Sequence, residues 1–431
     1  MFGLFDSVET KMRKTAANWL EVAGKVYHYR RDVLSDKNRE ELLAEIDKLR
    51  SLLRARADAS KLKLGIESIE VVLRKTGGHH YPKSGLVENV EFFLVAAIVI
   101  LGIRAYFVQP FKIPTNSMWP SYYGMTGQVY ASEDDEPGAI GAAFNFAAVG
   151  ARGYRLDAPA DGEVLLPVGG SERGVISYSQ IPGRTWLVFP AQKRQYRLFV
   201  GDRFTTFTVP LDFDFDTVVR DAFFPGDKRP FHQIASERIH AGQYVDRQIT
   251  TGAGTERVRF LRTGRTVRSG ERLLAFDILT GDQLFVDRIS YHFVRPKVGD
   301  GFVFRTGNID GIPGDQYYIK RLAGLPGDRL EIREPQLLRN GQPITGADAF
   351  DDNNNRAGEY AGYVNGPVRA SDPMLRAGEI ITVPPASYVA LGDNSNNSQD
   401  SRYWGYVPAR DVVGRPLFIY YPFTRRWGPA P

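Results

Sequence analysis

An uninterrupted apolar run is the feature that most constrains the fold of this chain. Residues 92–103 read FFLVAAIVILGI without a charge, and the apolar stretch resumes after Arg104 to reach 17 residues in all. That length lies at the short limit of a membrane span, and a buried core helix is the alternative. Arg104 is close enough to the end to snorkel, and Tyr106 and Phe107 suit the headgroup level. We therefore expect residues 91–108 to form a single transmembrane anchor.

The residues before this run indicate how the anchor is oriented. Residues 1–90 contain 17 Lys or Arg against 13 Asp or Glu, and Lys83 is the base nearest the run. Because bases that flank a span stay in the cytoplasm, we expect residues 1–90 to be cytoplasmic and the larger C-terminal part to lie outside. A cleaved signal peptide is not expected, since some 90 residues precede the run.

Residues 1–90 also carry a helical pattern. Ser35 is suited to cap a helix whose apolar residues recur at helical spacing from Leu42 to Leu53, and a second such stretch ends at Gly77-Gly78. We expect a helical hairpin that packs on itself. A coiled coil or docking arm is the alternative.

Composition narrows the chemistry and the fold of the remainder. The chain has no cysteine, which excludes disulfides, thiolate nucleophiles and cysteine-ligated zinc. A net charge of +5 over 431 residues is too weak to favour nucleic acid as a partner. The 43 glycines and 26 prolines favour turns, and short apolar runs such as 301–305 and 387–391 predict an all-β region beyond residue 110. The polar stretch 351–356 is expected to be a loop.

Three short segments could carry a reaction. The first, QPFKIPTNSMWP at 109–120, places Ser117 in a stretch that prolines keep extended. The second, YYIKRLAGLPGD at 317–328, places Lys320 among apolar neighbours, where burial would lower its pKa and leave a neutral amine able to take a proton from a serine. The third, LGDNSNNSQDSRYWGYVP at 391–408, is a polar loop. Taken singly, these are a surface serine, an edge lysine and a set of turn residues.

Metal binding is a competing interpretation of the third segment, because Asp393, Asn396 and Asp400 are oxygen donors. Their spacing does not match an EF-hand calcium loop. No G-x-S-x-G surrounds a candidate serine, so a Ser-His-Asp hydrolase is not favoured either. We expect no metal and no organic cofactor.

Together, these segments resemble bacterial type I signal peptidases, membrane-anchored Ser/Lys proteases that remove leader sequences from exported proteins. The resemblance covers residues 92–125 and about 279–425, and it includes TGDQLFVDRISYHFVRPKVGD at 280–300. It implies a mainly β catalytic domain with the signal-peptidase-like β fold, formed by residues 109–125 and 281–431. It also implies cleavage after an Ala-X-Ala-like site through an acyl-enzyme.

The same resemblance implies roles for individual residues. Ser117 would be the nucleophile, Lys320 the general base and Ser398 the hydroxyl that orients this lysine. The Ser117 backbone N–H and the Thr115 hydroxyl would form the oxyanion hole. The walls of shallow pockets for small substrate residues would be Phe111, Ile113, Pro114, Met118, Tyr318 and Ile319. The expected structural ion pairs are Asp393 with Arg321 and Asp400 with Arg402.

The chain departs from the family pattern in several places. Thr115 stands where serine is usual, and Asn116 where glycine is usual; asparagine is the next best residue if that position needs a positive φ. Ser121-Tyr122-Tyr123 replaces a usual Thr-Leu, and Ser395 replaces a usual arginine. The largest departure is residues 126–280, which we expect to be an inserted β-rich domain that gates substrates, binds a partner or adds stability. We expect its aspartates at turns and strand edges, not at a calcium site: Asp157, Asp212, Asp214 and Asp216.

The sequence thus favours a leader peptidase of the inner (plasma) membrane, single-pass, with a cytoplasmic N-terminus and an outward-facing catalytic domain. Its partners would be the signal peptides of exported preproteins, the lipid bilayer and, as a further candidate, the secretion machinery. Two other classes stay open. One is a membrane-anchored β-rich scaffold or binding protein that is a catalytically inactive relative. The other is a soluble Ser/Lys self-cleaving regulator, which would need a helix-turn-helix and no span.

Overall fold

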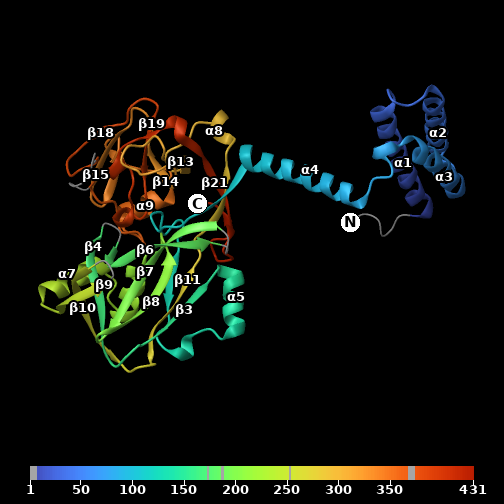
Figure 1. The fold of residues 1–431 in the computed structure, drawn as a ribbon. Coiled ribbons are helices and arrows are strands. Elements are labelled where there is room, and N and C mark those ends of the chain that lie inside the picture. The colour runs from blue at the N-terminus through green and yellow to red at the C-terminus, as the bar shows by residue number, and fades with distance from the viewer. Residues whose placement is uncertain (1–6, 172–173, 186–188, 252–253, 367–373) are drawn as a thin grey trace. The chain divides into compact units, whose positions relative to one another are not determined.

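The computed structural model describes residues 7–171, 174–185, 189–251, 254–366 and 374–431 (Figure 1). The chain divides into two compact units, Met1–Leu101 and Gly102–Pro431. All the residues that the sequence nominates for chemistry belong to the second unit.

A bundle of three helices forms most of the first unit. The helices are α1 (Val8–Arg30), α2 (Asp36–Arg54) and α3 (Ala59–Thr76), followed by the short η1 (Gly78–His80). Ser7, Ser35 and Asp58 cap the three long helices by accepting hydrogen bonds from backbone N–H groups of the first turns. The expected hairpin corresponds to α2 and α3. The sequence pattern missed α1 because its buried positions include Ala16 and Ala23, which give a weak apolar signal although one core joins all three helices.

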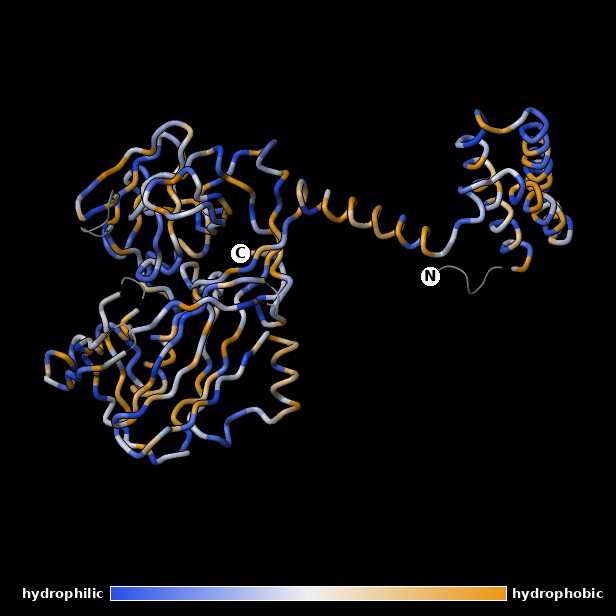
Figure 2. Tube along the Cα trace, viewed as in Figure 1, coloured by the Kyte–Doolittle hydropathy of each residue, from blue (hydrophilic) through white to orange (hydrophobic). Residues whose placement is uncertain are grey.

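The apolar run lies in helix α4 (Gly85–Tyr106). Among the described residues, it is the one helix long and apolar enough to cross a membrane, and none of its residues is buried. Figure 2 shows that hydrophobic residues follow one another along most of this helix. The helix begins before the expected segment 91–108 and ends at Tyr106, because Val108 already pairs with Asp287 in a sheet.

An eight-stranded antiparallel sheet forms the framework of the second unit. Along the sheet the order is β1 (Val108–Lys112), β12 (Gln283–Asp287), β21 (Val412–Tyr421), β13 (Gly301–Arg305), β14 (Tyr317–Gly324), β19 (Ser387–Leu391) and β20 (Val407–Pro408), while β22 (Gly428–Pro429) pairs with β21. Side chains of a strand alternate between the two faces. In β13, Val303 therefore joins one apolar core while Phe302 and Phe304 join another. Both faces of this sheet are covered by packed side chains.

A smaller four-stranded sheet packs beside the framework around its own core. Its order is β17 (Gln342–Pro343), β16 (Gln336–Arg339), β15 (Arg329–Arg333) and β18 (Ile381–Thr382). The short helices of this region are α8 (Ser290–Phe293), α9 (Asp348–Asn355), η3 (Ser395–Asn397), α10 (Ser401–Trp404) and η4 (Ala409–Asp411). The expected loop at 351–356 is wrong, because most of it belongs to α9. Asn353 and Asn354 are buried there and use their amides to bond the backbone of neighbouring segments.

The described residues of the insertion form two further sheets, three α-helices and one short 3-10 helix. The three-stranded sheet has the order β2 (Thr126–Val129), β11 (Arg272–Leu279) and β3 (Arg152–Asp157). The seven-stranded sheet has the order β6 (Tyr178–Thr185), β7 (Phe189–Val200), β4 (Gly162–Ser171), β10 (Gly254–Val267) and β9 (Tyr244–Thr251), with β5 (Gly174–Ile176) on β4 and β8 (Arg203–Pro210) on β7. The helices are η2 (Glu133–Asp135), α5 (Ala139–Val149), α6 (Phe215–Phe223) and α7 (Phe231–His240).

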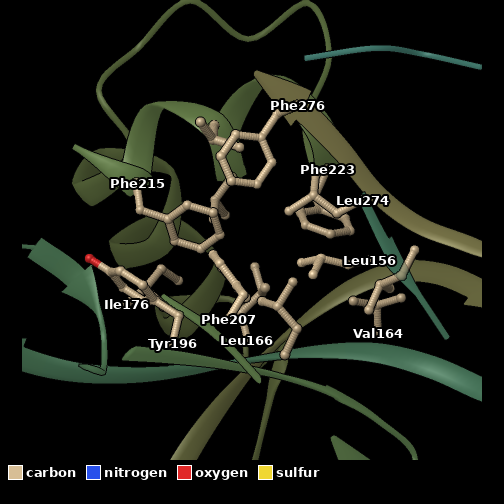
Figure 3. Packing of buried hydrophobic residues seen from close by; sticks show 14 of the residues in the cluster. Leu156, Val164, Leu166, Ile176, Tyr196, Phe207, Phe215, Phe223, Leu274 and Phe276 are labelled. Carbon is tan, nitrogen blue, oxygen red and sulfur yellow. The ribbon is translucent and has the colours of Figure 1, made fainter. Parts of the chain in front are cut away.

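One large core unites both sheets of the insertion with α6 and α7. Figure 3 shows the rings of Phe207, Phe215 and Phe276 meeting in this core, with ring centroids 5.0 to 6.1 Å apart. Aromatic rings at such separations pack edge-to-face or offset and bury large apolar areas. The expected fold class is therefore confirmed: a mainly β chain with a β-rich insertion, an N-terminal helical region and one long apolar helix.

Candidate active site

The loop that carries Ser117 is held closed by its neighbour in sequence. Asn116 Oδ1 accepts a hydrogen bond from the Gly124 N–H (2.9 Å), and its Nδ2 donates to the Met125 carbonyl (3.2 Å). A side chain on Gly124 would collide with the backbone of Thr115, so the two ends of the loop are in close contact. The backbone of Asn116 does not have a positive φ. Asparagine therefore serves here as a side-chain clamp, and not as a substitute for glycine's conformational freedom.

A second anchor holds the far side of the loop. The buried Asp282 accepts a hydrogen bond from the Tyr123 N–H (2.8 Å), and its own N–H donates to the Tyr123 carbonyl (2.8 Å). Arg426 donates to the Asp282 carboxylate (2.9 Å) and lies over the Tyr123 ring, 3.4 Å from its centroid. This network ties the Ser117 loop to the start of β12 and to the C-terminal segment of the chain.

Strand β14 brings Lys320 to Ser117. A hydrogen bond of 2.6 Å joins Lys320 Nζ and Ser117 Oγ, although the two residues are 203 positions apart. Lys320 is 4% exposed. Burial lowers the pKa of its amine to about 8 from an ordinary value of 10.5, against the opposing pull of Asp400 and Asp393. A lysine of this pKa has a substantial neutral fraction near pH 8, so it can accept a proton from the serine hydroxyl.

Ser398 lies close to the Ser117 backbone but forms no hydrogen bond with Lys320. Its Oγ is buried and has no hydrogen-bond partner among the described residues. A Cβ on Gly392 would lie 2.1 Å from this Oγ and 2.5 Å from the Ser117 carbonyl oxygen, so only glycine admits both groups. The structure thus places Ser398 next to the nucleophile's backbone, and its lysine-orienting role stays a prediction.

Two buried ion pairs support the site. Arg321 and Asp393 form a bidentate pair (2.7 and 2.8 Å), and so do Arg402 and Asp400 (both 2.8 Å). All four side chains are at most 3% exposed. Both pairs are fixed to backbone groups, because Arg321 donates to the Gly299 carbonyl and Asp400 accepts from the Gly392 N–H. Bidentate pairs with further hydrogen bonds hold a geometry more rigidly than single contacts do.

The polar loop after β19 is bonded directly to the nucleophile's segment. The Asn394 N–H donates to the Ser117 carbonyl (3.1 Å), and Asn394 Nδ2 donates to the Asn116 carbonyl (3.0 Å). Asn353 of α9 donates to the Asp393 carbonyl (3.0 Å) and so holds this loop from behind. These hydrogen bonds hold the segment of Ser117, the loop after β19 and helix α9 together, although the three are remote in sequence.

A cleft of about 2230 Å³ opens over the Ser117–Lys320 pair. The expected pocket residues that line it are Phe111, Ile113, Pro114, Tyr318 and Ile319, together with the expected oxyanion residue Thr115. Met118 does not line it, because its side chain is fully buried in the core below the sheet. The apolar wall between β1 and β14 therefore has one residue fewer than expected.

Sequence reasoning missed Asn116 as a clamp and did not single out Asp282, Asn394, Asn353 or Arg426. Asp282 had a visible signal, because Gly281-Asp282 opens one of the segments that carry the family resemblance. A side chain on Gly281 would lie 1.9 Å from the Ile113 carbonyl oxygen, which explains the glycine. The other residues act through contacts that join distant segments.

Comparison with known proteins finds signal peptidases from several bacteria. The family model for signal peptidase, peptidase S26, matches residues 274–421, which include Lys320 and Ser398 but not Ser117. A signal peptidase I of Leptolyngbya laminosa is 32% identical over 177 residues, which cover 40% of this chain and 76% of the relative. A probable signal peptidase I-1 of Synechocystis sp. is 34% identical over 34% of this chain and 66% of the relative, just under two thirds of its length. An inactive signal peptidase IA of Staphylococcus aureus is 30% identical over 34% of this chain and 72% of its own length.

Proposed function

Because the chain belongs to the signal peptidase I family of serine peptidases, we propose that it cleaves signal peptides from exported preproteins with Ser117 and Lys320 as its catalytic pair. The observation that carries this proposal is the 2.6 Å contact between Ser117 Oγ and the buried Lys320 Nζ. Ser117 lies outside the segment that the family model matches, so the contact is evidence independent of that match.

The chemistry follows from these two groups. Neutral Lys320 takes the hydroxyl proton as Ser117 Oγ bonds to the carbonyl carbon of the scissile peptide. The Ser117 N–H and the Thr115 hydroxyl donate to the oxyanion. The protonated lysine then gives its proton to the leaving amine, and an ester between Ser117 and the signal peptide remains. Lys320, neutral again, activates a water that hydrolyses this ester and restores the serine.

The apolar wall supplies the proposed specificity. Phe111, Ile113 and Ile319 line the cleft, and we infer that shallow pockets among them accept small residues such as alanine at positions −1 and −3 and exclude larger ones. We place the enzyme in the inner membrane with α4 as its anchor, residues 1–90 in the cytoplasm and the cleft outside. A signal peptide that is itself in the bilayer then meets a peptidase tethered to the same membrane.

The second candidate is a membrane-anchored scaffold without activity, which the name of the inactive Staphylococcus aureus relative favours. Cleavage of a model preprotein by the detergent-solubilised full chain distinguishes the two. We expect a product that begins directly after an Ala-X-Ala-like site, and recovery of the protein in the membrane fraction after alkaline extraction. An intact preprotein in the presence of a folded sample would support the scaffold instead.

The pH dependence of cleavage reports the ionisation of Lys320. Since the base must be neutral and its pKa is about 8, kcat/KM is expected to rise about tenfold per pH unit below that value and to level off above it. At pH 7 only about one-tenth of the enzyme carries the neutral amine. The measurement is kcat/KM against pH, with circular dichroism at each pH to confirm that the fold persists. A rise centred near 10.5, the ordinary lysine value, would mean that Lys320 is not the buried base.

A further inference from the structure

The insertion forms a second wall of the active-site cleft. Alongside the residues around Ser117 and Lys320, the cleft is lined by the β8–α6 loop, α6, α7 and the segment that joins these two helices. Lining residues with exposed side chains on this wall include Asp212, Asp221, Lys228, His232, Gln233 and Ser236. The insertion is therefore part of the cleft itself.

The wall is connected directly to the loop of the nucleophile. Strand β2 begins at Thr126, immediately after the Asn116 clamp closes on Met125, and Thr126 pairs with Leu279 of β11. The chain then reaches Asp282, which bonds Tyr123. Both ends of the insertion are thus fixed at the base of the Ser117 loop, so its cleft wall is held in position relative to the reacting groups.

The two walls differ in chemistry. The wall between β1 and β14 is mostly apolar, whereas the wall of the insertion presents charged and amide side chains. Some of its aspartates have structural roles: Asp214 caps α6, and Asp216 accepts hydrogen bonds from the Val175 and Ile176 N–H groups. In contrast, the side chains of Asp212, His232 and Gln233 make no hydrogen bond or ion pair with other described residues. They are available to a ligand that enters the cleft.

We propose that this polar wall of the insertion binds the mature part of the preprotein, on the C-terminal side of the scissile bond. The inference rests on the proposed function. A substrate in this cleft has two ends of different character. The residues before the scissile bond are small and apolar and match the wall between β1 and β14. The residues after it begin an exported, water-soluble protein, so they are polar and match the wall that carries Asp212, His232 and Gln233. The insertion therefore selects substrates by the sequence that follows the cleavage site.

Two peptides test this inference with the full-length, detergent-solubilised protein. Both carry the same residues up to the scissile bond; one ends about two residues after it, and the other continues for about 12 polar residues, roughly 40 Å when extended. The wild type is expected to cleave the long peptide with about tenfold higher kcat/KM, chiefly through a lower KM. The triple variant Asp212→Ala, His232→Ala, Gln233→Ala is expected to lose this preference while its kcat/KM for the short peptide stays unchanged.

A double variant, Glu133→Ala with Asp134→Ala, is the matched control, because both residues are exposed in the insertion and neither lines the cleft. It should keep the wild-type preference. Equal rates for the two peptides in the wild type, or a preference that survives in the triple variant, would overturn the inference while the proposed function stands. Failure of the wild type to cleave either peptide would contradict the proposed function, and the inference with it.

Discussion

Alanine at Ser117, at Lys320 or at both positions is expected to lower the rate of preprotein cleavage by a similar factor, on the order of 10⁴ or more. The two residues act as one unit, because Oγ becomes a strong nucleophile only when Nζ removes its proton across the 2.6 Å contact. The second substitution should therefore add little to the first. The measurement is single-turnover cleavage of a model preprotein by the four proteins. Losses that multiply in the double variant would mean that the residues act independently.

Ser398→Ala is the informative companion to these variants. Its hydroxyl is buried and has no hydrogen-bond partner in the part of the chain that the structure describes, so its removal should leave the stability of the fold nearly unchanged or slightly higher. A fall in kcat with an unchanged melting temperature would indicate that the hydroxyl orients Lys320 during the reaction. Full activity would limit Ser398 to packing beside Gly392.

Breaking a buried ion pair is expected to destabilise the second unit strongly. Asp393→Ala leaves the Arg321 guanidinium charged and buried, since the two side chains are 0% and 3% exposed. Loss of one partner of such a pair costs about 3 to 5 kcal/mol. Because Asp393 also belongs to the loop that bonds the Ser117 carbonyl, cleavage should fall with stability. Urea unfolding followed by near-ultraviolet circular dichroism, in a Ser117→Ala background that prevents self-cleavage, measures the change in free energy.

Asp202→Ala is the control for this measurement. Asp202 forms an ion pair of 2.9 Å with Arg247 on the surface of the same unit, and its side chain is 98% exposed. Solvent screens a pair of this kind, so the expected cost is below about 1 kcal/mol. Equal costs for Asp393→Ala and Asp202→Ala would show that burial of the Arg321–Asp393 pair has no energetic consequence.

The apolar helix and the candidate site residues could be predicted from the sequence. A run of apolar residues long enough for a membrane predicts α4, because hydrophobicity over such a length depends only on neighbours in the chain. Taken singly, the serine, lysine and loop segments did not indicate a reaction; their joint resemblance to type I signal peptidases supplied the predicted chemistry. Ser117, Lys320, Arg321 and Asp393 were nominated through that resemblance before any distance was known.

Some structural details escaped sequence analysis because short-range patterns do not encode them. Helix α1 is joined to its bundle by alanines, and α9 is a helix in a stretch rich in Asn and Asp because the buried amides find partners elsewhere. The expected extended backbone of the Pro-rich segment 109–120 is wrong around Met118, which lies in a hydrogen-bonded turn: the Tyr122 N–H donates to the Met118 carbonyl (2.8 Å). Packing against the sheet turned the Met118 side chain into the core and away from the cleft.

The sequence by itself determined which groups are present, where the apolar helix lies and which segments belong together. Only the tertiary structure decided that Oγ and Nζ, 203 positions apart, meet at 2.6 Å, and that burial lowers the pKa of the lysine to about 8. It also decided that residues of the insertion line the same cleft. The physical reason is that a pKa, a hydrogen bond and a cleft depend on distance and on exclusion of water. Both arise when strands and loops remote in the chain pack against one another.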